Sequence, residues 1–139
     1  LKTKEMGKKI ILGTLGGTVA GMVVAMAIFM GLLGGTMEEW MKDYAGCLKE
    51  MNMAAGIAGS LVLSLFMALV LHKFGVSTFK GGAIAGTWIT FLMVLWFGIW
   101  NASTFTAYTW DWLPLDVIGN TLAGALGGGV IGWIFGKVK

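Results

Sequence analysis

The chain has 139 residues, of which 57% are hydrophobic and only 12% are charged. Soluble domains carry about 25% charged residues, so this composition excludes an ordinary soluble domain. A helix needs roughly 20 apolar residues to cross a hydrocarbon core, and lipid cannot satisfy the polar groups of any open strand. The sequence therefore predicts an all-α membrane protein with four transmembrane helices, because four long stretches contain no Asp, Glu, Lys or Arg: residues 10–37, 51–71, 81–110 and 117–136.

The first predicted span covers about residues 10–33 and ends at a pair of glycines. Its apolar run exceeds the ~7–15 residues of a signal-peptide core, so we interpret it as a retained helix. Thr36 and Glu39 then have the spacing of a capping box, and apolar residues recur on one helical face. We predict a short amphipathic helix over about residues 37–51, lying on the outer membrane surface, with a polar loop as the alternative.

The remaining spans are predicted at about residues 53–71, 83–101 and 115–136. Pro114 fits the first turn of the last of these helices, where a missing backbone N–H costs little. The connection before it is rich in threonine and aromatic residues. It contains Trp and Tyr, which are enriched at membrane interfaces.

Two pairs of segments are similar at the same offset of 65 residues. Residues 16–21 match residues 81–86, and residues 57–61 match residues 122–126. These matches predict two parallel copies of a two-helix hairpin, related by an axis along the membrane normal. The alternative is chance similarity between segments that are rich in glycine and alanine.

The distribution of lysines predicts the orientation. Eight of the ten lysines flank the predicted spans on the side of the two termini, and only Lys42 and Lys49 lie on the other side. Cytoplasmic segments carry the excess of basic residues, so we expect both termini in the cytoplasm. The basic residues are divided among short segments beside the membrane, and they do not indicate nucleic-acid binding.

Small residues recur at four-residue intervals on three of the predicted spans, as in a glycine zipper. Such stripes let helix backbones approach closely in lipid, so they predict tight helix packing, within the chain or against another subunit. The predicted packing residues are Gly13, Gly17 and Gly21; Gly56, Ser60 and Ser64; and Gly124, Gly128 and Gly132.

Asp116 and Asn120 lie on the same track of the last span as its glycines. An ionisable group inside a membrane indicates a functional site, so the pair is a candidate for binding a proton or a cation. The alternative is structural, because an acid at a helix N-terminus is favoured by the helix dipole and Asn120 can bond to a neighbouring helix.

Met22, Met26 and Met30 form a row along one face of the first span, called here the methionine row. Thioethers are soft ligands that suit Cu(I), so the row is a candidate copper path. The alternative is that flexible methionines fill gaps around glycine-rich helices.

The pattern of residues 81–100 followed by residues 116–136, with aromatic residues between them, resembles small four-span bacterial membrane proteins of unknown function. The resemblance covers the second half of the chain. It implies four helices and a bacterial inner membrane, and it implies no functional residue.

The sequence contains no recognisable catalytic triad, Cys/His metal cluster or phosphate-binding loop, so we expect neither enzymatic activity nor a cofactor. The leading hypothesis is a small structural or accessory subunit of a membrane complex, or a homo-oligomer. The alternative is a small transporter or channel for Cu(I), protons or another cation, although uncharged polar residues are sparse in the spans. We expect the lipid bilayer, other membrane subunits or a second copy as partners, and no soluble substrate is indicated.

Overall fold

A computed structural model describes residues 2–138, and this part of the chain contains helices and no strand. Four helices are long and apolar enough to cross a membrane, which confirms the all-α class and the predicted number of long apolar helices. The elements are α1 (Lys2–Met26), a π-helical segment η1 (Ala27–Leu32), α2 (Gly34–Asp43), α3 (Met53–Lys73), α4 (Phe79–Thr104) and α5 (Trp112–Lys137).

The first half of the chain differs from the prediction at two places. α1 begins at Lys2 instead of near residue 10, because the lysines before the apolar run are good helix formers and can extend it. The predicted helix over residues 37–51 is shorter and starts earlier, at Gly34–Asp43. Thr36 lies inside α2 and is not its N-cap, because η1 leads directly into α2 and the Met37 N–H bonds to the carbonyl of Leu33 at 2.8 Å.

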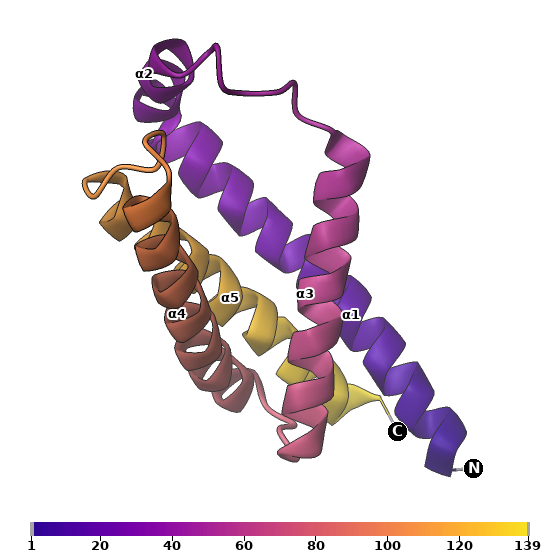
Figure 1. Ribbon diagram of the computed structural model, residues 1–139. Coiled ribbons are helices and arrows are strands. Elements are labelled where there is room, and N and C mark those ends of the chain that lie inside the picture. Colours follow the sequence, from indigo (N-terminus) through magenta and orange to yellow (C-terminus); the bar gives the residue numbers. More distant parts are fainter. Residues whose placement is uncertain (1, 139) are drawn as a thin grey trace.

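α5 is the central helix of the bundle and carries more buried residues than any other helix of the described chain. α4 packs closely along one side of α5, and α1 packs along another (Figure 1). The α4–α5 seam is glycine on both sides, since Gly82 and Gly86 of α4 lie against Gly124 and Gly128 of α5. The absence of side chains lets the two backbones touch, which is how such helices gain packing energy in lipid.

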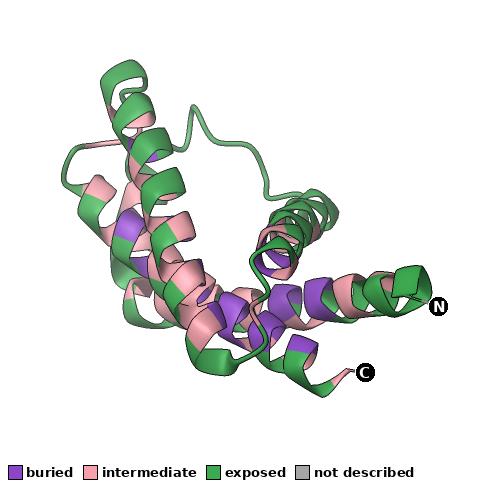
Figure 2. Ribbon diagram, turned by 90° about the horizontal axis from the view of Figure 1, so that it is seen from below, coloured by how far each residue is buried: buried purple, intermediate pink, exposed green. Residues whose placement is uncertain are grey.

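α3 packs against the bundle only through its second half. Met67, Ala68 and Leu71 are buried, whereas every residue from 53 to 59 is exposed. α3 scarcely contacts α4, and the two helices diverge toward the α2 end of the molecule (Figure 1). Figure 2 shows the buried residues gathered where the long helices meet.

Both termini lie at one end of the bundle, called here the terminal end, and α2 covers the opposite end (Figure 1). The Trp40 indole N–H donates to the carbonyl of Ala107 at 2.6 Å, and its ring stacks on Trp112 with centroids 6.2 Å apart. These contacts attach α2 to the α4–α5 connection. They place a cluster of aromatic side chains at the α2 end.

Candidate functional site

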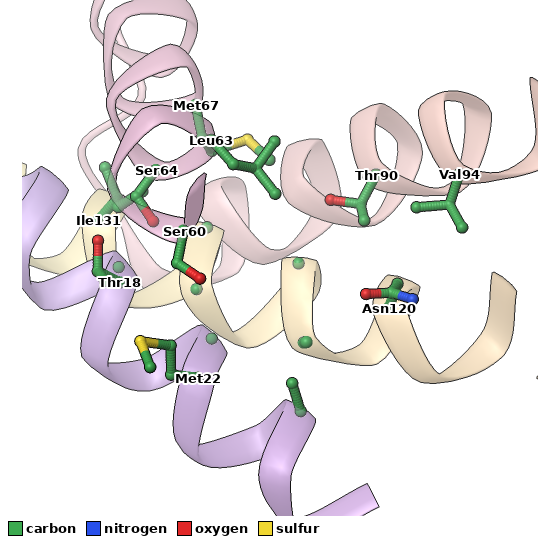
Figure 3. A pocket seen from close by; sticks show the side chains of 17 residues that line it. Thr18, Met22, Ser60, Leu63, Ser64, Met67, Thr90, Val94, Asn120 and Ile131 are labelled. Carbon is green, nitrogen blue, oxygen red and sulfur yellow. The ribbon is translucent and has the colours of Figure 1, made fainter. Parts of the chain in front are cut away.

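A cavity of about 160 Å³ lies where α1, α3, α4 and α5 meet, in the middle of their length (Figure 3). Met67 and Ile131 form its floor toward the terminal end. They belong to a buried apolar cluster with Leu71 and Phe135, which closes this side of the cavity. The cavity is not closed beside α3, because Leu63 of α3 lines it and is also 43% exposed.

Uncharged polar side chains from all four long helices converge on this cavity. Among the residues described, its lining contains no Asp, Glu, Lys or Arg. The remaining walls are apolar side chains and glycine backbone. The polar lining residues are Thr18 of α1, Ser60 and Ser64 of α3, Thr90 of α4 and Asn120 of α5 (Figure 3).

Two of these hydroxyls have already used their protons. Thr18 Oγ1 donates to the carbonyl of Thr14 at 2.8 Å, and Ser60 Oγ donates to the carbonyl of Gly56 at 3.0 Å. A hydroxyl has one proton and two lone pairs, so each of these oxygens can still accept. The cavity therefore presents them as hydrogen-bond acceptors.

Thr90 differs from Thr18 and Ser60. It is only 4% exposed, and its Oγ1 has no hydrogen-bond partner within residues 2–138. A buried hydroxyl without a partner costs about 1–3 kcal/mol, so it needs an explanation. Its neighbour on α5 is Gly124, where any Cβ would collide with the Thr90 side chain. The glycine thus lets Thr90 project between the helices.

Asn120 is held in one orientation from the α2 end. Its Nδ2 donates to the backbone carbonyl of Asp116 at 2.9 Å and to Asp116 Oδ1 at 2.8 Å. With the nitrogen held there, the Asn120 oxygen points toward the interior of the cavity (Figure 3). The Tyr108 hydroxyl donates to the other carboxyl oxygen, Asp116 Oδ2, at 2.5 Å. Burial, together with the bond to Asp116, raises the pKa of Tyr108 well above its ordinary range.

The structure thus places the candidate pair Asp116 and Asn120 in different roles. Asn120 lines the cavity, while Asp116 lies behind it, half-buried, and bonds to Asn120 and Tyr108. The sequence contained no signal for Tyr108, because it lies in a connecting segment whose path cannot be read from helical periodicity. Thr90 was recognisable as a polar residue in a span, but its position over a glycine was not.

The predicted packing residues divide into three groups. Gly13, Gly17 and Gly21 face α5, where a Cβ on Gly17 would lie 2.6 Å from Ile131 Cδ1. Ser60 and Ser64 line the cavity, and Gly56 has no atom within 4 Å of an added Cβ. On α5, the stripe Gly124, Gly128 and Gly132 faces α4 and the segment before it. The stripes of α1 and α5 are therefore used inside the chain.

The methionine row does not share one environment. Met22 lines the cavity, whereas Met26 is 52% exposed and Met30 is 67% exposed. The second thioether in the cavity lining is Met67 of α3. Residues 2–138 contain no group of three or more His, Cys, Asp or Glu side chains placed to hold a metal ion.

Comparison of the chain with protein-family models, with curated proteins and with solved structures finds no match in any of the three.

Proposed function

We propose that the chain is a non-enzymatic membrane protein that binds a small uncharged solute in the cavity between its four long helices and conducts it across the bilayer. The observation that carries this proposal is the convergence of polar side chains from four helices on one cavity. Polar groups inside a membrane protein are expensive, and they gather where a solute or ion must be accommodated. Although uncharged polar residues are sparse in the spans, five of them line this cavity: Thr18, Ser60, Ser64, Thr90 and Asn120.

The shape of the bundle supports a site that is accessible from one side. The buried cluster around Leu71 and Phe135 closes the terminal end, whereas residues 53–59 of α3, toward the α2 end, are all exposed. Transporters alternate access by moving one group of helices against another around a central site. α3 is suited to be the moving element, because only its second half is packed against the bundle.

A filled cavity tests this function. Ser64→Leu places a larger apolar side chain into the lining from α3, and Ala58→Leu is the matched control on the same helix, at an exposed position outside the cavity. Proteoliposomes are mixed rapidly with glycerol and their swelling is followed by light scattering. We expect wild type and Ala58→Leu to accelerate glycerol entry and Ser64→Leu to resemble protein-free liposomes. Equal rates for wild type and Ser64→Leu would contradict the proposal.

The orientation and membrane belong to the same proposal. Lys73, Lys80 and Lys137 lie at the ends of helices on the side of the termini. We assign this side to the cytoplasm, and the membrane to a bacterial inner membrane, from the lysine distribution and the resemblance described above.

A second candidate function is that of an accessory subunit or homo-oligomer. The exposed first half of α3 favours this function. Met53 is 58% exposed, Ile57 is 41% exposed, and Gly56 between them leaves open space. A helix from another chain would find a flat apolar surface there. Native mass spectrometry from mild detergent tests this candidate, because it reports subunits and bound ligands together; a monomer free of protein partners would count against it.

A further inference from the structure

We infer that the solute is an uncharged molecule with a hydroxyl group, and that this hydroxyl binds between Thr90 and Asn120. The inference rests on the proposed function and specifies the substrate class of the same cavity. Thr90 offers a buried proton donor without a partner, and Asn120 offers an acceptor whose orientation is held by Asp116. A hydroxyl is the simplest group that accepts from the first and donates to the second.

The two side chains lie on the same helix seam. Thr90 of α4 sits against Gly124 of α5, and Asn120 precedes Gly124 by four residues on α5. Positions four apart lie one above the other on a helix, about 5–6 Å between them. Thr90 therefore faces α5 one helical turn from Asn120, and both side chains line the same cavity.

The rest of the lining favours an uncharged solute that donates hydrogen bonds over a cation. Thr18 and Ser60 present oxygens whose protons are already bonded, so further hydroxyl or N–H groups of the solute can donate to them. A cation would also find oxygens here, but an unpaired charge in an apolar interior carries a desolvation penalty of several kcal/mol or more. The nearest acid, Asp116, lies outside the lining and is bonded to Tyr108 and Asn120.

The cavity volume limits the size of the solute. A volume of about 160 Å³ is close to the ~150 Å³ of an engineered cavity that accepts benzene. One six-membered ring or a short polyol therefore fits. Apolar walls from Met22, Leu63 and Val94 suit the carbon skeleton of such a molecule.

Cyclohexanol and cyclohexanone form the decisive pair of probes, because they have the same ring and differ in whether the oxygen can donate. Binding is measured by calorimetry in nanodiscs, with the heat of partition into empty nanodiscs subtracted. We expect wild type to prefer the alcohol, by up to about tenfold for one additional hydrogen bond. Asn120→Leu has a similar shape and no acceptor, so the preference should disappear. Thr90→Val removes the donor and should weaken both probes.

The outcomes separate the two proposals. Equal binding of both probes to wild type, lost in Ser64→Leu, would overturn the hydroxyl assignment and leave the cavity as the solute site. Binding that survives in Ser64→Leu would place the probes outside the cavity and overturn both proposals, as would the absence of binding to wild type. If Asn120→Leu binds the alcohol and the ketone in the same ratio as wild type does, the hydroxyl assignment is also overturned, whatever the stability of the variant.

Discussion

Gly128 lies at the closest approach of α4 and α5, and a single added methyl group tests whether this seam holds the bundle together. A Cβ on Gly128 would lie 2.5 Å from the carbonyl oxygen of Gly82 and 3.0 Å from the Cα of Gly86. Both atoms belong to the backbone of α4, so the overlap is relieved only if the helices move apart. Overpacked cores lose about 1–3 kcal/mol, and we expect Gly128→Ala to lower the free energy of unfolding by that amount.

Gly56→Ala is the matched control, because the same change in α3 meets no atom within 4 Å. Alanine exceeds glycine in helix propensity by up to ~1 kcal/mol, so this variant should be as stable as wild type or more stable. Unfolding is followed by far-UV circular dichroism in mixed micelles with increasing SDS content. If both variants shift the midpoint equally, the α4–α5 seam is not the tight interface inferred from its glycines.

Three further predictions concern the α2 end, the methionine row and the orientation. Tyr108→Phe removes the hydrogen bond to Asp116 and should cost about 1–2 kcal/mol at neutral pH. Because the pKa of Tyr108 is raised in the folded protein, this stabilisation is complete below pH ~10 and is lost as the pH rises further. The difference in unfolding free energy between wild type and Tyr108→Phe should therefore shrink at alkaline pH, and a constant difference would contradict this prediction. Replacing the methionine row by leucine should leave the copper content unchanged after Cu(I) loading under reducing conditions, and a drop measured by elemental analysis would revive the copper path. In a Cys47→Ser background, an impermeant maleimide added outside should label Lys42→Cys and miss Lys80→Cys; the reverse pattern would overturn the orientation.

The number and approximate positions of the long helices were predictable because they depend on where charges are absent. The local errors came from connections between helices. Thr36 and Glu39 have capping-box spacing, but a capping box forms only where the preceding backbone leaves N–H groups unpaired. Here η1 runs directly into α2, and the Met37 N–H already bonds to Leu33. The sequence gives no clear signal for this π-helical segment.

The sequence reveals the polar residues of the cavity but not their arrangement in space. The polar residues of the spans were visible in the sequence, but the four long helices are apolar on all sides, so periodicity does not reveal which face each turns inward. Thr90 and Asn120 line the same cavity because Gly86 and Gly124 fix the rotation of α4 against α5. Helix rotation of this kind follows from backbone contacts between segments distant in sequence, which a single sequence does not specify.

The two hairpins of the proposed repeat differ at the positions that create the cavity. At the offset of 65 residues, Leu63 and Met67 of α3 correspond to Gly128 and Gly132 of α5. The α5 glycines let α4 approach until the backbones touch. Leu63 and Met67 cannot permit the same approach, and both line the cavity. The α1–α3 hairpin is therefore less closely packed than the α4–α5 hairpin, and the space between its helices and the α4–α5 seam is where the polar side chains gather.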